Sequence, residues 1–333
     1  MPRLLTLALV AILLAMPARP ASAQNMVGFA VITDTNVFGD TLSLGMGGIS
    51  PAPPGSHYQG WLRAPDGSQP LDIGSIAVAE DGTVQHVHVS AQRQNLLGVY
   101  TVLEITIEPD GDVDPAPNGA VVFGGRIPDG IVPAARELLF QWSSSRFGTP
   151  SGQGLYIDAL LLDRTAGEMV DAANAGDLDG AKRLAERLVN TVEGEGGANY
   201  GDHNGDGQAQ GPGDGTGALN YAWGSYWRAK VAAANAPGDT WVEEQANWIS
   251  ASAELQIVPR LAELRDQGLA FQAVSDVGEA QQRAQTLREA ASRVLVGFDA
   301  NGDGAVDINS AEGGAFHVLV QGQYLAAIRI VPV

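Results

Sequence analysis

The spacing of hydrophobic and polar residues changes near residue 130 of the chain. Before this point, short runs alternate between apolar and polar residues and end at turns rich in Gly, Pro and Asp. Residues 84–89 and 103–108 are two such runs, and an alternation of period two is typical of strands with one buried face. Several strands spaced about ten residues apart are typical of a sandwich. The pattern therefore predicts an antiparallel β-sandwich over residues 24–128.

After this point the hydrophobic residues recur at helical spacing. Residues 181–192 and 280–298 each carry an apolar stripe, which buries one face of an amphipathic helix. Asp177 or Asp179 is positioned to start the first of these helices. Such helices predict an all-α bundle for residues 131–333, and so an α+β chain of two domains. The same spacing gives further helices at residues 132–146, 154–174, 217–235, 240–267 and 311–329.

One short motif occurs twice, each time between two predicted helices. Residues 202–207 read DHNGDG and residues 299–304 read DANGDG, with oxygen-bearing side chains at alternate positions. Ca²⁺ binds about six to eight oxygen atoms at roughly 2.3–2.6 Å. Gly207 and Gly304 permit the sharp turn that such a loop requires. The motif predicts Ca²⁺ binding, and the alternative is an ordinary turn, in which Asp, Asn and Gly are also common.

This duplicated helix–loop–helix arrangement resembles a pair of EF-hands. The two loops match ligand positions one, three and five of that family, and position seven would offer a backbone carbonyl. The second loop also has an acid at position nine. The ligands that the resemblance implies are Asp202, Asn204, Asp206 and the Gln208 carbonyl in the first loop, and Asp299, Asn301, Asp303, the Ala305 carbonyl and Asp307 in the second.

The loops depart from the EF-hand pattern at position twelve, where the family has a bidentate Glu. The nearest carboxylates come one and two residues later, at Asp214 and Glu312. Either acid could close a slightly longer loop, which gives loops at residues 202–214 and 299–312. In the alternative, the later residues are linker and the ions bind more weakly. We expect the ions to stabilise the helical domain, because weak sites suffice for Ca²⁺ outside the cytosol.

The first residues have the features of an export signal. Arg3 precedes an apolar run at residues 4–16, and Ala21-Ser22-Ala23 offers a small-residue cleavage site. We therefore expect a signal peptide at residues 1–23, cleavage after Ala23, and a secreted or periplasmic mature chain. No Cys is present, so neither disulfides nor thiolate metal sites are expected. No transmembrane segment is expected in the mature chain, because no later apolar stretch is long enough.

The formal net charge of −19 narrows the range of partners. Nucleic acids and anionic lipid surfaces attract basic proteins, so neither is expected to bind this chain. An acidic surface attracts cations instead, in agreement with the two loops. The partners we expect are calcium ions and an envelope protein or a glycan.

The β-rich part contains short motifs in a characteristic order. They are YQGWL at residues 58–62, ITIEP at residues 105–109, and PNG at residues 117–119 followed by two valines. Over about residues 40–127 this order resembles the extracytoplasmic C-terminal domain of anti-sigma-K (RskA-type) factors. The resemblance implies an envelope sensing or binding module. We expect neither the cytoplasmic zinc-type segment nor the membrane-spanning helix of such factors here.

No catalytic motif is recognisable in the sequence. A phosphate-binding loop with its lysine and a Gly-x-Ser-x-Gly motif are both absent. Asp158, Asp163 and Glu168 lie along one predicted helix, and we interpret them as solvent-facing. We expect an exported, calcium-binding, non-enzymatic binding or structural module of the cell envelope or extracellular space. The alternatives are a secreted hydrolase with structural Ca²⁺ and an envelope component of an anti-sigma-factor-type stress-signalling system.

Overall fold

The computed structural model describes residues 26–333 except residues 113, 115 and 308–311. The chain forms two compact units. The first contains the residues up to Pro133 together with Ala326–Val333, and the second is Ala134–Leu325. The second unit is therefore inserted into the chain of the first, which differs from a helical domain that continues to residue 333. The predicted signal peptide, residues 1–23, lies outside the described residues.

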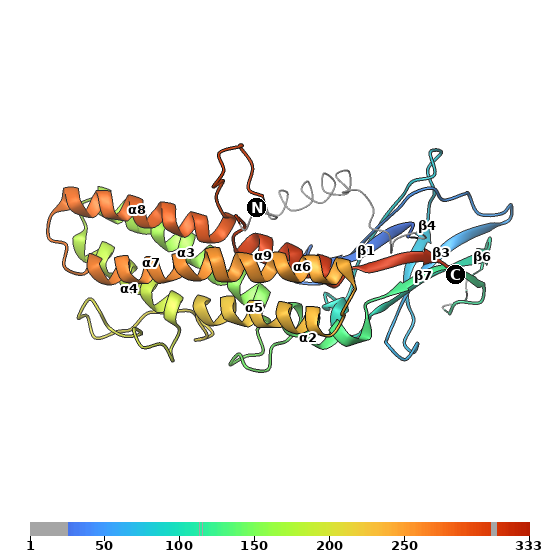
Figure 1. Ribbon diagram of the computed structural model, residues 1–333, viewed down its shortest axis with the longest axis horizontal. Coiled ribbons are helices and arrows are strands. Elements are labelled where there is room, and N and C mark those ends of the chain that lie inside the picture. Colours follow the sequence, from blue (N-terminus) through green and yellow to red (C-terminus); the bar gives the residue numbers. More distant parts are fainter. Residues whose placement is uncertain (1–25, 113, 115, 308–311) are drawn as a thin grey trace. The chain divides into compact units, whose positions relative to one another are not determined.

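The first unit is an antiparallel β-sheet, as its alternating pattern predicted (Figure 1). Within the described residues, eight strands form one sheet in the order β4-β3-β6-β7-β8-β1-β2-β5. Every pair of neighbours runs antiparallel. The strands are β1 (Gly28–Thr33), β2 (Thr41–Met46), β3 (Ser56–Arg63), β4 (Leu71–Ile76), β5 (Val84–Val89), β6 (Val102–Pro109), β7 (Ala120–Arg126) and β8 (Ile328–Pro332).

Strand β8 joins the two halves of this sheet, although it comes from the end of the chain. It pairs with β7 on one side and with β1 on the other, where Gly28 opposes Ile330. The helix predicted over residues 311–329 is wrong at its end, because α9 (Ala315–Leu325) stops earlier and a strand follows. A short apolar run suits a buried helix and a buried strand equally, so only the tertiary pairing decides.

The two edge strands approach each other, so the sheet is a nearly closed barrel and not two separate layers. The imidazole Nε2 of His86 in β5 lies 2.7 Å from the carbonyl oxygen of Ile73 in β4. Alternation along a strand shows which residues are buried, but it does not show which strands are neighbours. The sequence therefore predicted the antiparallel strands and could not distinguish a barrel from a sandwich.

Large apolar side chains are buried on both faces of β3 and β6. Leu62, Leu103 and Ile105 share one face and are at most 1% exposed. Trp61 is the neighbour of Leu62 in β3 and so lies on the opposite face, where it is 2% exposed. Its indole N–H donates to the Thr106 hydroxyl at 3.0 Å, so the polar atom of this buried side chain is satisfied. Full burial of a Leu or Ile side chain stabilises a fold by about 1.5–3 kcal/mol.

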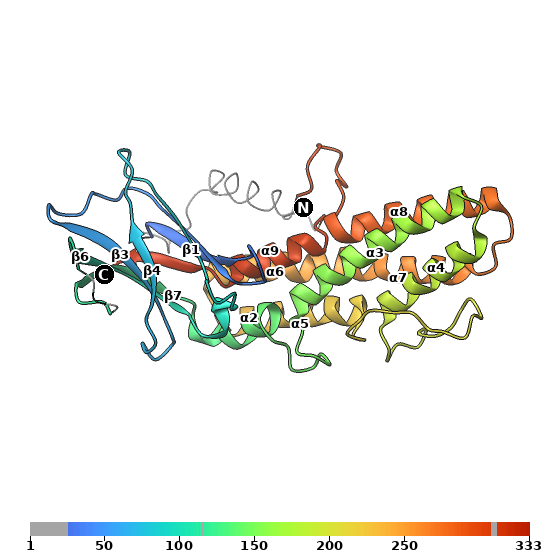
Figure 2. The same cartoon turned by 180° about the vertical axis from the view of Figure 1, so that it is seen from behind.

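The second unit begins within α2 and consists of helices (Figure 2). The apolar stripes predicted at residues 181–192 and 280–298 are confirmed, because most of their side chains are buried in α4 and α8. Asp177 caps α4 by accepting a hydrogen bond from the Gly180 N–H at 2.8 Å. Helix α3 packs against α4, α5, α8 and α9. The helices are α2 (Val132–Leu139), α3 (Ser151–Asn174), α4 (Leu178–Glu193), α5 (Ala218–Ala234), α6 (Thr240–Ala251), α7 (Val258–Phe271), α8 (Val277–Val296) and α9, with the short segment η4 (Ser252–Ile257). Two further short segments, η2 (Leu96–Gly98) and η3 (Asp129–Ile131), belong to the first unit.

Helices α6 and α7 follow each other through the π-helical segment η4. Pro259 lies in the first turn of α7. It has no N–H to donate to a carbonyl one turn earlier, so the backbone cannot keep the α-helical hydrogen-bond pattern there. The helix predicted over residues 240–267 is confirmed, with this local change of geometry.

Candidate functional site

The loop between α4 and α5 contains the first copy of the repeated motif. Asp202 accepts hydrogen bonds from the backbone N–H groups three and five residues later, at 2.7 and 2.8 Å. Asn204 and Asp206 each accept one from the N–H two residues later, at 2.7 and 2.9 Å. Gly205 and Gly207 have φ angles of +79° and +86°, which L side chains rarely adopt. The motif is therefore a tight turn held by its own polar side chains.

The loop between α8 and α9 repeats this network. Asp299 accepts from the N–H groups three and five residues later, at 2.6 and 2.7 Å. Asn301 and Asp303 each accept from the N–H two residues later at 2.9 Å. The hydrogen bond from the Gly304 N–H contributes most to holding the pKa of Asp299 below its ordinary value. The repeat in the sequence is thus also a repeat in structure.

A buried glutamate lies behind each loop. Glu186 in α4 is fully buried and accepts hydrogen bonds from the backbone N–H groups at positions two, three and nine of the first loop, at 2.8, 3.1 and 3.1 Å. Glu312 is 1% exposed and accepts from the same three positions of the second loop, at 2.9, 3.2 and 2.8 Å. Glu186 precedes its loop in the chain, whereas Glu312 follows its loop. Each carboxylate stabilises a loop through charge-assisted hydrogen bonds.

The two acids predicted to close the loops have different contacts. Glu312 contacts the backbone of its own loop and so lies with the residues of the second motif. Asp214 accepts hydrogen bonds from the Thr216 N–H, at 3.0 Å, and from the Tyr221 hydroxyl. Asp214 is therefore tied to the start of α5, and none of its hydrogen bonds within the described residues reaches the first motif.

The remaining candidate ligands occupy later loop positions. Gln208 and Ala305 each donate a backbone N–H to the acid two residues earlier at 2.9 Å, and Asp307 donates its N–H to Glu312. Within the described residues, no group of three or more His, Cys, Asp or Glu side chains could hold a metal ion. Each motif offers two aspartates and one asparagine, so a Ca²⁺ ion there would need backbone or water oxygens as well.

Sequence reasoning missed the polar residues by which α4 holds the first loop. Glu186, Asn190 and Glu193 are at most 8% exposed. The Asn190 side chain donates to the carbonyl of Gly201 and accepts from its N–H, both at 2.9 Å. Glu193 accepts from the backbone and side-chain amides of Asn199, both at 3.3 Å. The sequence does contain a pattern that could have indicated them, because these three polar residues recur at intervals of four and three and so share one helix face.

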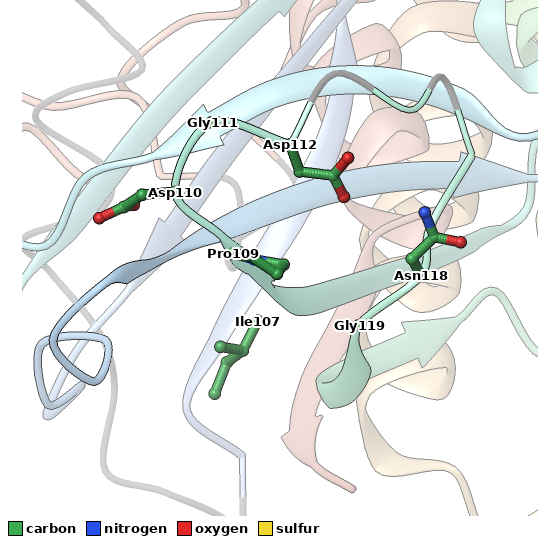
Figure 3. Close-up of a pocket in the computed structure, with 7 residues that line it drawn as sticks. All are labelled: Ile107, Pro109, Asp110, Gly111, Asp112, Asn118 and Gly119. Atoms are coloured by element: carbon green, nitrogen blue, oxygen red, sulfur yellow. The ribbon is translucent and has the colours of Figure 1, made fainter.

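A separate hollow lies on the first unit, at the turn between β6 and β7 (Figure 3). Figure 3 shows Asp112 and Asn118 on either side of the turn, with Asp110 directed away from both. The Asp110 carboxylate lies 3.4 Å from Nδ1 of His57. The described residues of the lining include no Ser, Cys or Lys that could act as a nucleophile. They are Ile107, Pro109, Asp110, Gly111, Asp112, Asn118 and Gly119.

Comparison with known protein families supports the resemblance of the first unit. A family model described as "Anti-sigma-K factor rskA, C-terminal" matches residues 5–121, which include strands β1 to β6. The RskA-type resemblance expected from the sequence motifs is thereby confirmed for this part of the chain. No curated protein and no solved structure matches the chain. In the part that the structure describes, none of the helices is both long enough and apolar enough to span a membrane.

Proposed function

We propose that this chain is an extracytoplasmic, non-enzymatic component of an anti-sigma-factor-type envelope signalling system. The observation that carries the proposal is the family match over residues 5–121, which includes most strands of the sheet. In this role the sheet unit would bind an envelope protein. Because a shared domain alone does not establish a function, the test must measure signalling directly.

Deletion of the gene in its host, followed by sequencing of total RNA, provides that test. We expect the transcripts of one sigma-factor regulon to rise together, because an inhibitory component has been removed. Expression of the full chain from a plasmid should restore the original levels. The same chain without residues 2–23 should not restore them, because it stays inside the cell. Unchanged transcripts after deletion, or restoration by the leaderless chain, would contradict the proposal.

We further propose that the loops at residues 202–214 and 299–312 bind Ca²⁺ and that the ions stabilise the helical unit. In support, two segments far apart in the chain have the same pattern of hydrogen bonds, and each donates to its own buried glutamate, Glu186 or Glu312, behind the loop. Asp206 and Asp303 each accept a backbone N–H with Oδ1. Oδ2 of Asp206 accepts from the Asn204 side-chain amide at 3.3 Å and lies 3.7 Å from Nε of Arg183, so an ion there would replace these two contacts. Carboxylate and amide oxygens are ligands that Ca²⁺ prefers. Ca²⁺ bound at such sites would stabilise the folded helical unit.

Thermal melts with and without a chelator test the calcium proposal. At a Ca²⁺ concentration 100-fold above the Kd, one site adds about 2.7 kcal/mol of stability, so chelation should lower the melting temperature. Asp206→Asn combined with Asp303→Asn keeps both Oδ1 acceptors and removes one charge per loop, so this variant should respond much less. Asp171→Asn, which changes an exposed acid of α3, should respond as the wild type does. Coincident wild-type melts would refute calcium stabilisation.

A further inference from the structure

Asp158 is buried in the helical unit with one carboxylate oxygen unpartnered. It lies in α3 and is only 4% exposed, so its interpretation as a solvent-facing residue is wrong. Its Oδ2 atom is shielded from solvent and has no hydrogen-bond partner within the described residues. An ionised carboxylate in such a place is costly unless a positive charge compensates it. Asp158 therefore requires either a proton or a cation.

A second acid, Asp214, places its negative charge near Asp158. Burial and then the negative charge of Asp214 raise the pKa of Asp158 well above its ordinary value. Asp214 accepts a hydrogen bond from the Tyr221 hydroxyl. The Tyr221 ring packs on Gly154, where an added Cβ would lie 2.4 Å from the ring. Gly154 lies about one helical turn before Asp158, so the Tyr221 ring lies against the face of α3 that carries Asp158.

Within the described residues, the side chains that act on Asp158 and Tyr221 provide oxygen atoms and no positive charge. Burial, and next the hydrogen bond to Asp214, raise the pKa of Tyr221, while the hydroxyls of Thr216 and Thr149 act in the opposite direction. Among the described residues, neither acid forms an ion pair with Arg, Lys or His. Two carboxylates accompanied by hydroxyl groups are a donor set for hard cations.

We propose that Asp158, Asp214 and the Tyr221 hydroxyl bind a hard divalent cation, such as Ca²⁺, between α3 and the start of α5. The ion supplies the positive charge that the two acids lack, and it ties the end of the 202–214 loop to α3. This site is separate from the repeated motifs at residues 202–207 and 299–304, because the hydrogen bonds of Asp214 within the described residues go to Thr216 and Tyr221 and to neither motif. It depends neither on ion binding by those motifs nor on the signalling role.

Calorimetric titration of the chelator-treated full chain with Ca²⁺ tests this site by counting ions. Asp158→Asn keeps the shape of the side chain and removes its charge, so it should bind one ion fewer per chain than the wild type. The matched control Asp171→Asn, on the same helix but exposed, should bind as many ions as the wild type. The loop variant Asp206→Asn with Asp303→Asn should still bind this ion, and adding Asp158→Asn should abolish its binding. Equal counts in the wild type and Asp158→Asn would overturn the proposal.

A second variant separates the cation from a proton on Asp158. Tyr221→Phe retains both acids and the ring that packs on Gly154, and it removes one oxygen donor. We expect the Kd for this ion to rise several-fold while the count stays the same. If Asp158 only holds a proton, Tyr221→Phe will bind Ca²⁺ as the wild type does, and Asp158→Asn will melt no lower than the wild type in Ca²⁺. That result would also overturn the proposal, and the Tyr221→Phe measurement decides even if Asp158→Asn fails to fold.

Discussion

Buried acids in this protein hold turns of the polypeptide backbone. Asp40, Glu186 and Glu312 are at most 1% exposed, and each accepts hydrogen bonds from three backbone N–H groups. A carboxylate offers about four acceptor positions, so one acid can satisfy several N–H groups that a turn leaves unpaired. Removal of the acid leaves those buried N–H donors without an acceptor, which lowers the free energy of unfolding by about 1–3 kcal/mol for each group.

Glu186→Gln should destabilise the first loop. The amide nitrogen of Gln cannot accept a hydrogen bond, so at least one buried N–H loses its acceptor. We expect the free energy of unfolding in urea to fall by about 2–4 kcal/mol. Hydrogen exchange should become faster at the amides of His203, Asn204 and Gln210. The control Glu289→Gln, at an exposed position of α8, should change stability by less than about 0.5 kcal/mol. Equal stability of the two variants would contradict the role of Glu186.

Asp40 makes the sheet unit sensitive to acid. Burial alone would raise its pKa, but hydrogen bonds outweigh burial and hold the pKa below its ordinary value. The donors are the N–H groups of Thr35, Asn36 and Val37 and the hydroxyl of Thr41. A carboxylate whose pKa is lower in the folded state stabilises the fold above its unfolded pKa, and this contribution is lost as the pH falls through the folded pKa.

Asp40→Asn should therefore be less stable than the wild type at neutral pH. We expect its free energy of unfolding to be lower by about 1–3 kcal/mol. The difference should shrink as the pH falls below about 4, near the ordinary pKa of an Asp. Urea unfolding of both proteins at neutral and at acidic pH checks this expectation. A difference that stays constant with pH would show that the charge of Asp40 is not responsible.

The sequence reveals the acids of the motifs but not the buried acids. Asp202 and Asp299 stand out because alternate spacing and a following Gly form a local pattern. Glu186 and Asp158 lie in regular helices, where burial depends on which segment packs against that helix face. A single carboxylate next to an apolar stripe looks the same whether water or a loop covers it. Long-range packing, which one sequence does not display, makes the difference.

The strands and helices were largely predictable, whereas their pairing was not. Period-two alternation located β5 and β6, and helical stripes located α4 and α8, because each signal extends over several residues. Strand β8 has only five residues and follows α9 closely, so its pattern is too short to establish a period. Its pairing with β1 and β7 also explains why one continuous sheet forms instead of two layers.

Two neighbouring residues of β8 should respond differently to truncation. Ile330 is fully buried, whereas Val331 is 39% exposed. Ile330→Ala removes core contacts and should lower the free energy of unfolding by about 2–5 kcal/mol. Val331→Ala should lower it by less than about 1 kcal/mol. Urea denaturation of both variants provides the comparison, and similar losses would contradict the assignment of the inward face of this strand.

The chain combines two units of different architecture, and its net charge is strongly negative. The helical unit, Ala134–Leu325, contains its own buried core and its own helix caps. The sheet unit draws its strands from both ends of the chain. The family match covers residues of the sheet unit only. The proposals about the helical unit are therefore argued from the residues of that unit alone.

We expect residues 134–325, expressed alone, to fold. Circular dichroism should show a helical spectrum and a cooperative thermal transition. Residues 26–133 alone lack β8, which leaves β1 and β7 without their shared neighbour. The same segment joined by a flexible linker to residues 326–333 should therefore melt at a higher temperature. Equal melting temperatures with and without β8 would show that this strand is dispensable.

The position of β8 also sets the order in which the chain can complete its folding. The ribosome makes residues 328–332 after the whole helical unit. The strands made first must therefore wait, with β1 and β7 unjoined, until the helical unit has been synthesised. A stop codon or a proteolytic cut just before residue 328 would damage the part of the chain that is made first and spare the helices made after it.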